Sequence, residues 1–193
     1  MRIPYVPDPP NFTSEEDKAI EERIRKRRGT KGLINLDRAL LHAPPVADGW
    51  NAFLGAIRTQ TSLSPSIRET AICRVAALNH AWYEWEAHAP ILLSSAHVTQ
   101  PHVDAVLHSP PREVGEGILD AAHAAVLRYT DAMTLDVRVS EEVFGELRKW
   151  FGEKEVVEIT ATVGAYNCVS RFLVALDVGE RNGQDGPREG GKE

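Results

Sequence analysis

The stretch that most constrains the fold of this chain runs over residues 68–90, RETAICRVAALNHAWYEWEAHAP. Its first part is nearly all apolar and predicts a helix, because no strand alternation interrupts it. Asn79 and His80 then form a polar break, and a second helical segment rich in aromatic residues follows. The pattern predicts a pair of helices at the centre of the fold, with the rest of the chain as its scaffold and lid.

Three ionisable side chains in this stretch are candidates for chemistry. Glu84 and His88 are four residues apart, which places a carboxylate and an imidazole on one helical face about one turn apart. His88 is the candidate general acid or base, and Glu84 is expected to orient it. Glu69, one helix earlier, is expected to fold back onto the same site. The alternatives are a surface ion pair for Glu84 with His88, and a favourable acid in the first turns of its helix for Glu69.

Aromatic residues favour the functional interpretation of the Glu84 and His88 pair. Trp82, Tyr83 and Trp85 crowd the same turn, and the preceding helix is nearly all apolar. An ionisable pair in such surroundings is expected to be partly buried, which is costly without a purpose. Tyr83 can either donate its hydroxyl to a substrate oxygen or belong to the core.

Length and composition bound the class of protein. A chain of 193 residues with 42% hydrophobic and 26% charged residues predicts one globular domain with its own core. The net charge of −6 argues against nucleic acid as a partner. Cys73 and Cys168 lie far apart in apolar helical patterns and are interpreted as buried, inert thiols, which suits a reducing, cytoplasmic compartment. No leader is evident and no apolar run approaches a membrane span. The histidines show no ligand spacing, so we expect no metal.

The chain as a whole is predicted to be all-α. Residues 1–12 are proline-rich and form an arm, residues 13–178 form the helical domain, and residues 179–193 are expected to be a disordered tail. The 134–139 stretch is interpreted as a linker. Helices are predicted over residues 13–28, 33–42, 46–59, 65–78, 81–96, 99–107, 113–133, 140–151 and 154–176.

The central stretch resembles the signature of the carboxymuconolactone decarboxylase and alkyl hydroperoxidase D superfamily. It is most similar to the branch whose helix pair reads RELAILRVAxLNxAxYEWxxHxP. The similarity extends upstream over LINLDRALLHAPPVADGWNAFLGAIR and downstream over YNCVSRFLVALDV. It therefore covers residues 20–178, and it implies the helical, oligomeric fold of that superfamily, assembled as trimers or hexamers.

In the hydroperoxidase branch, a glutamate on the first helix is followed by a CxxC motif and a histidine four residues later. Here the glutamate matches Glu69 and the histidine matches His88. The two cysteine positions are Ala81 and Glu84, and a histidine between them falls on Tyr83. Thiol peroxidase chemistry needs an attacking and a resolving thiol, so the resemblance implies that this activity is lost.

What the resemblance leaves is the acid-base half of the site, as in the decarboxylase branch. It implies a cofactor-free lyase or isomerase that acts on a small lactone or oxo-acid, with His88 as proton donor and Glu84 as its orienter. Glu69 and Tyr83 would position the substrate, and Trp82 and Trp85 would wall the pocket. Arg74 would pair with a substrate carboxylate, with an interface or surface role as the alternative.

Two other functions stay open at this point. One is a non-catalytic member of the same fold that binds a small molecule or serves assembly. The other, disfavoured, is a peroxidase with displaced thiols; Cys73 lies on the wrong helix and at the wrong spacing for it.

Overall fold

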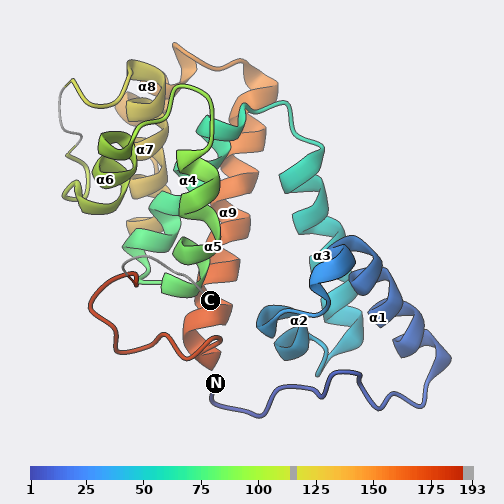
Figure 1. Cartoon of the computed structure of the whole chain (residues 1–193). Helices are drawn as coiled ribbons and strands as arrows, with labels where there is room; N and C mark the ends of the chain where they lie inside the picture. The colour runs from blue at the N-terminus through green and yellow to red at the C-terminus, as the bar shows by residue number, and fades with distance from the viewer. Residues whose placement is uncertain (114–116, 189–193) are drawn as a thin grey trace.

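The computed structural model describes residues 1–113 and 117–188, and within them the regular structure is helical throughout, which confirms the all-α prediction. Figure 1 shows the elements in chain order. They are α1 (Glu15–Arg28), the short 3-10 helix η1 (Gly29–Lys31), α2 (Asn35–Leu40), α3 (Pro44–Thr59), α4 (Pro65–Leu78), α5 (Trp82–Leu93), α6 (Gln100–His108), α7 (Ala121–Leu135), α8 (Glu141–Arg148) and α9 (Glu153–Leu176).

The centre of the domain is α4. Every residue from Glu69 to Ala77 is buried. Helices α5, α6, α7 and α9 all pack against it and enclose it (Figure 1). A helix enclosed in this way needs apolar residues on all faces, which explains why its sequence shows no polar stripe. Ser64 caps its first turn by accepting from the Ile67 amide at 3.3 Å, and Pro65 occupies the first helical position.

Helices α1, α2 and α3 form a second group, which packs onto α9 through α3. Here α3 begins at Pro44, two residues before the predicted start, because proline is compatible with the first turn of a helix. The arm of residues 1–12 has no regular structure, as predicted. It is fixed by backbone hydrogen bonds from Arg2 to Leu176 at 2.8 Å and from Val6 to Arg38 at 3.3 Å.

The predicted helix over residues 113–133 is wrong at its start. Residues 114–116 lie outside the described part, and α7 begins only at Ala121. Asp120 is its N-cap, with a side chain that accepts from the His123 amide at 2.9 Å. Ile118, which falls within the predicted span, lies before the helix and is half exposed. Because Asp120 caps the first turn of α7, the residues before it are not part of the helix.

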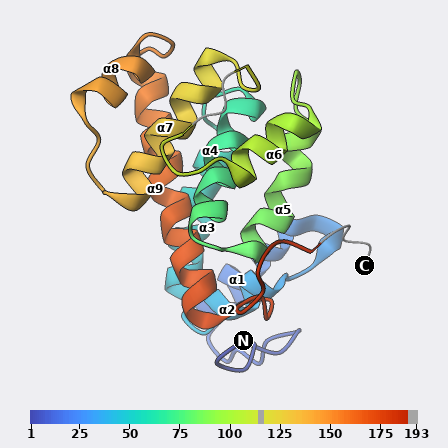
Figure 2. The ribbon, with the colours of Figure 1, turned by 90° about the vertical axis from the view of Figure 1, so that its left-hand side faces the viewer.

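The described part of the tail is ordered against α5, contrary to the prediction of disorder for residues 179–193. The Trp82 indole donates to the Gln184 carbonyl at 2.9 Å, and Arg181 pairs with Glu86 at 2.8 Å. Figure 2 shows this segment crossing beside α5. Residues 189–193 lie outside the described part. A Gly-rich composition predicted disorder, but the specific contacts of α5 hold the chain.

The sequence analysis found no run near the length of a membrane span, and α9 corrects that expectation. Its 24 residues are long and apolar enough to cross a membrane by length and composition. Buried core positions, among them Ile159, Val163 and Tyr166, account for that apolar character, because α9 packs against α3, α4 and α7.

Candidate functional site

The turn between α4 and α5 brings the candidate residues together. Asn79 ends α4, and His80 takes a left-handed conformation with φ of 51° that reverses the chain direction. Glu69 precedes this turn by about as many residues as His88 follows it. At 1.5 Å of rise per residue the two side chains therefore reach the same level of the helix pair.

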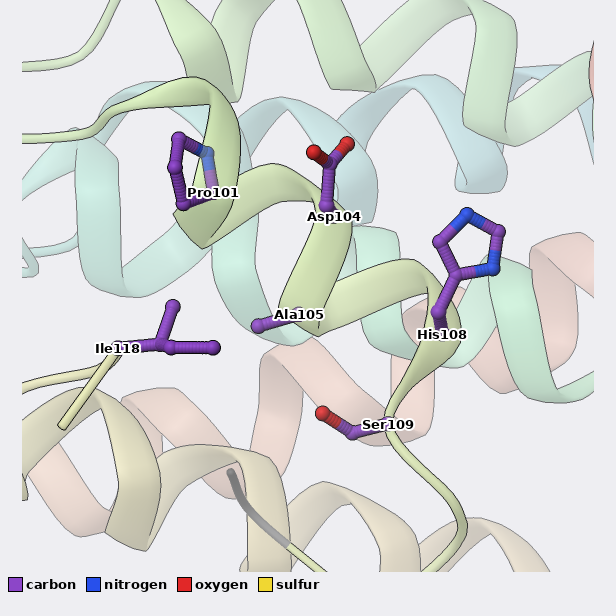
Figure 3. A pocket seen from close by; sticks show the side chains of 6 residues that line it. All are labelled: Pro101, Asp104, Ala105, His108, Ser109 and Ile118. Atoms are coloured by element: carbon purple, nitrogen blue, oxygen red, sulfur yellow. The ribbon is translucent and has the colours of Figure 1, made fainter. Parts of the chain in front are cut away.

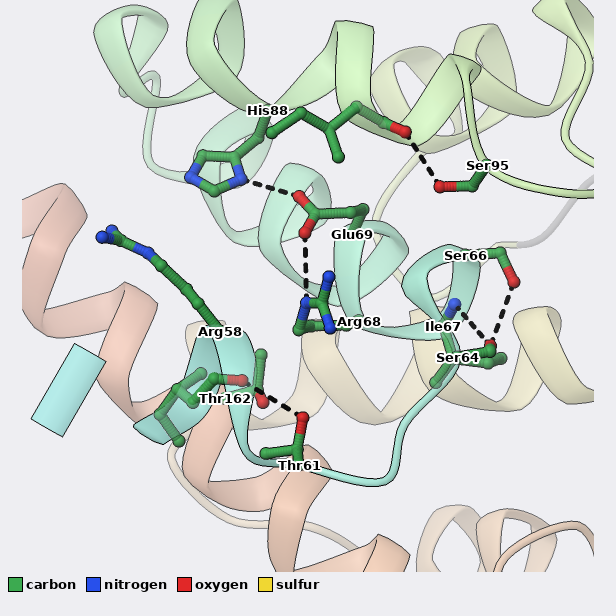
Figure 4. Close-up of polar contacts among 12 residues, drawn as sticks. Arg58, Thr61, Ser64, Ser66, Ile67, Arg68, Glu69, His88, Ser95 and Thr162 are labelled. Carbon is green, nitrogen blue, oxygen red and sulfur yellow. Dashed lines mark hydrogen bonds and ion pairs between the residues drawn. The ribbon is translucent and has the colours of Figure 1, made fainter. Parts of the chain in front are cut away.

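Glu69 and His88 form a dyad across the helix pair. The Nδ1 atom of His88 lies 2.7 Å from Oε2 of Glu69, and the side chains are 12% and 4% exposed (Figure 4). Arg68 donates from Nε to the other Glu69 oxygen at 3.2 Å. A carboxylate that accepts the Nδ1–H proton fixes the tautomer and leaves Nε2 to exchange a proton with a substrate.

Glu84 is not the partner of His88, which corrects the prediction drawn from their spacing. Its carboxyl oxygens lie 3.1 and 3.2 Å from Oγ of Ser170 on α9, and the residue is 2% exposed. Helical spacing placed Glu84 within one turn of His88. In the folded chain, however, Glu84 contacts α9 and His88 contacts α4.

The contacts of the Glu84 carboxyl group favour its protonated form. Ser170 has one hydroxyl hydrogen, and its Oγ lies 2.9 Å from the Tyr166 carbonyl as well as beside Glu84. A neutral carboxyl satisfies all three groups by donating to Oγ while the hydroxyl donates to the carbonyl. Burial raises the pKa of Glu84 well above its usual range, more than Ser170 and the Arg58 charge lower it.

This protonation state predicts how stability depends on pH. Above the pKa of an unfolded glutamate the unfolded chain ionises while the folded chain does not. Glu84 therefore loses stabilising effect as pH rises, by up to about 1.4 kcal/mol per pH unit, until the folded pKa is reached. Glu84→Gln keeps a donor for Ser170 and lacks this slope. Urea unfolding from pH 5 to pH 8 should show that the unfolding free energy of Glu84→Gln rises relative to that of the parent. If the two unfolding free energies change with pH in parallel, Glu84 is ionised in the folded chain.

The three aromatic residues expected around the site pack elsewhere. Trp82 holds the tail through Gln184, and Trp85 is 5% exposed in the cluster formed with Cys73 and Leu92. Tyr83 packs so closely on Gly179 that an added Cβ there would lie 2.3 Å from its ring. The ring that contacts His88 is Tyr166 of α9, edge-on with centroids 5.0 Å apart.

Arg74 is a structural residue, which corrects its assignment to a substrate carboxylate. It is 1% exposed, and it binds Asp131 of α7 with two hydrogen bonds, Nε at 2.5 Å and NH2 at 2.9 Å. Its remaining nitrogen donates to the Val106 and Ser109 carbonyls, both at 3.0 Å. These contacts join α4, α6 and α7 and engage four of the five N–H donors of a side chain that is closed off from solvent.

Sequence reasoning missed Arg58 and Tyr166. The Arg58 Nε donates to the Tyr166 hydroxyl at 2.8 Å, and its Cζ lies 5.6 Å from the centre of that ring. Burial raises the pKa of Tyr166 to about 12, so the phenol keeps its proton. Arg58 was missed because an arginine in the last turn of a helix is already explained by its favourable interaction with the helix dipole. In addition, no sequence spacing links residue 58 to residue 88.

Both cysteines are free thiols. Cys73 is fully buried, and burial first, then the Glu69 and Glu84 carboxyl groups, raise the pKa of its thiol well above the usual value. Such a thiol is a poor nucleophile at neutral pH. Cys168 is exposed on α9, contrary to the expectation that both are buried.

Two of the scattered histidines meet in the interior. The rings of His102 and His123 pack edge to face with centroids 4.7 Å apart, and Nε2 of His102 lies 3.1 Å from the Thr70 hydroxyl. Burial lowers the pKa of His102 to about 4, so the ring is neutral at pH 7. Over residues 1–113 and 117–188, no three side chains of His, Cys, Asp or Glu converge as metal ligands would.

A surface hollow of about 420 Å³ lies on the outer side of α6, apart from the dyad (Figure 3). Neither Glu69 nor His88 lines it, and it is open to solvent. Its lining residues are Pro101, Asp104, Ala105, His108, Ser109 and Ile118.

Comparison with known proteins places this fold. Residues 44–127 match the model of the Carboxymuconolactone decarboxylase family, which spans α3 to the first half of α7. No curated protein matches the chain by sequence.

Solved structures share the fold at low identity. An uncharacterized peroxidase-related protein from Silicibacter sp. TM1040 is 19% identical with a TM-score of 0.69, covering 94% of this chain and 95% of its own. An uncharacterized peroxidase-related protein with an alkylhydroperoxidase AhpD core, from Ralstonia eutropha JMP134, is 20% identical with a TM-score of 0.63, covering 89% and 87%. The debrominase Bmp8 is 15% identical with a TM-score of 0.65, covering 85% of each chain. Residues 44–127 therefore resemble the Carboxymuconolactone decarboxylase family, and the chain shares its helical fold with peroxidase-related proteins that include an alkylhydroperoxidase AhpD core.

Proposed function

We propose that the chain is a cofactor-free acid-base catalyst, a lyase or isomerase that acts on a small lactone or oxo-acid. The observation that carries the proposal is the dyad. His88 Nδ1 lies 2.7 Å from Glu69 Oε2, and both side chains are largely removed from water. Glu69, rather than Glu84, is the residue that orients the imidazole.

The chemistry asked of this dyad is one proton transfer. When a carboxylate leaves as CO₂, the electron pair of the broken C–C bond moves into a neighbouring carbonyl or lactone and forms an enolate. The His88 imidazolium then gives its Nε2 proton to the enolate carbon, and the Glu69 carboxylate stabilises the cation before the transfer. In an isomerisation, neutral His88 would first remove a proton from carbon and then return it to another position.

Loss of thiol peroxidase activity is part of the proposal. Ala81 and Glu84 occupy the places of the two cysteines, and Glu84 is a buried carboxylic acid without redox chemistry. Cys73 has a raised thiol pKa and no exposed surface. The debrominase Bmp8 shares this fold and is named for a different reaction, debromination.

The direct test is a search for product from a panel of small lactones and oxo-acids with the parent, Glu69→Gln and Glu84→Gln. Glu69→Gln keeps the shape but no longer stabilises the imidazolium, so we expect turnover to fall by about tenfold or more. Glu84→Gln mimics the neutral acid and should keep turnover within about threefold. Equal turnover in all three would exclude the dyad. If no compound yields product but some bind, the chain is a binding protein of this fold.

We also propose that the chain is a cytoplasmic homo-oligomer, a trimer or hexamer, without nucleic acid or membrane partners. Val46 and Phe53 on α3 and Val157 on α9 are half exposed or more. The buried polar atoms Trp50 Nε1 and Asn51 Oδ1 on α3 have no hydrogen-bond partner in the described part. An interface over α3 would cover these apolar side chains. Light scattering at micromolar concentration should show the oligomer, and a monodisperse monomer would contradict it.

A further inference from the structure

Arg58 is a cation without a counter-ion beside the dyad. Only its Nε is engaged, by the Tyr166 hydroxyl, and no ion pair or second hydrogen bond occupies the guanidinium among the described residues. Its side chain is partly buried. By contrast Arg68 is paired with Glu69 and Arg74 with Asp131. Four N–H donors of Arg58 therefore remain for a ligand.

Tyr166 links this cation to the proton-transfer group. The Tyr166 ring contacts the His88 ring edge-on, and it also lies within cation–π distance of the Arg58 guanidinium. Figure 4 shows the Arg58 guanidinium and the His88 imidazole on the same side of Glu69. The Tyr166 hydroxyl accepts from Arg58, so its own proton remains available for an acceptor.

The charges around the dyad leave an excess of positive charge. Glu69 is matched by Arg68, and the Glu84 carboxyl group contacts Ser170, so neither forms an ion pair with Arg58. Arg27 and Arg28 on α1 share one carboxylate, Asp37, at 3.5 and 2.7 Å. Burial first, then the Arg28 charge, lower the pKa of Arg27, while Asp37 raises it. In a chain with a net charge of −6, this local excess needs an anion.

We infer that Arg58, with the Tyr166 hydroxyl, is the subsite that binds a carboxylate of the substrate and so presents the reacting carbon to His88. This inference rests on the proposed function and adds the recognition residue to it. The carboxylate held by Arg58 is one that stays on the molecule, because an ion-paired carboxylate is stabilised against leaving as CO₂. The ligand class is therefore a small acid with one anionic anchor beside a carbonyl or lactone.

The probe is levulinate, a small oxo-acid, with methyl levulinate as its uncharged match. The Nε–H proton of Arg58 is hydrogen-bonded and can be followed by ¹H–¹⁵N NMR during a titration of the full-length protein. We expect this signal to shift with levulinate and not with the ester. We expect Arg58→Gln to weaken levulinate binding by about tenfold or more, and Arg58→Lys to weaken it less, because the charge is kept and the planar fork is lost.

Two controls make the result specific. Arg138→Gln removes the same charge from an exposed residue in the α7–α8 connection and should bind levulinate within about twofold of the parent. His88→Ala should also bind it within about threefold, so the subsite can be established even if no turnover is found. Thermal unfolding shows whether each variant is folded. If Arg58→Gln does not fold, Arg58→Lys is used to test the subsite. The inference is overturned if the ester binds as tightly as the acid, if Arg58→Gln and Arg58→Lys both bind like the parent, or if levulinate does not bind.

Discussion

Replacing His88 by alanine is expected to lower turnover of a lactone or oxo-acid substrate by about 100-fold or more, the usual worth of one general acid or base. Substrate affinity should change much less, since the proton transfer stabilises the transition state and not the bound substrate. The measurement is steady-state kinetics on a compound found active in the panel, together with equilibrium binding of the same compound.

Two further variants separate proton transfer from mere packing. Added imidazole should restore part of the activity of His88→Ala, because a small base can occupy the vacated space; a purely structural residue would not be rescued. His108→Ala removes an exposed histidine that lines the hollow on α6 and should leave turnover unchanged. Undiminished activity in His88→Ala would falsify the assignment, and loss of activity in His108→Ala would move the site to α6.

The largest effect on stability is expected at the Arg74 and Asp131 pair. Both side chains are within 1% of complete burial, and Asp131 also accepts from the Arg112 amide at 2.7 Å. Arg74→Met would leave Asp131 as a buried charge without its cation, at a cost of about 3–5 kcal/mol in unfolding free energy. Urea unfolding at pH 7, monitored by circular dichroism, measures this loss.

The matched control is the double variant Arg74→Met with Asp131→Leu. It removes both charges and fills the space with apolar groups, so it should recover much of the stability lost by Arg74→Met. The same pair tests the corrected role of Arg74. If Arg74→Met were as stable as the parent but bound levulinate weakly, the guanidinium would be a ligand-binding group after all.

The sequence by itself determined the helix pair and placed Glu69 and His88 in one site, but it did not identify them as each other's partners. The apolar run of α4 predicted a buried helix, and its observed bounds, Pro65–Leu78, are those predicted from the Ser64 cap and Pro65. His88 was named as a candidate general acid or base four residues after Glu84, and Glu69, one helix earlier, was expected to fold back onto the same site. When two helices run antiparallel across a short turn, residues at similar distances from the turn lie at the same height along the helix pair. This placement can be predicted from the sequence near the turn.

Only the tertiary structure decided which groups these residues meet. Helical spacing predicted that Glu84 pairs with His88. In the structure Glu84 contacts Ser170 of α9, and His88 contacts Glu69 of α4. Arg74 looked available from the sequence until α7 brought Asp131 to it. Arg58 entered the site only because α3 packs on α9 beside Tyr166. Periodicity fixes the face of a helix on which a side chain lies, whereas its partner is chosen by packing between segments distant in sequence, which leaves no pattern in any one of them.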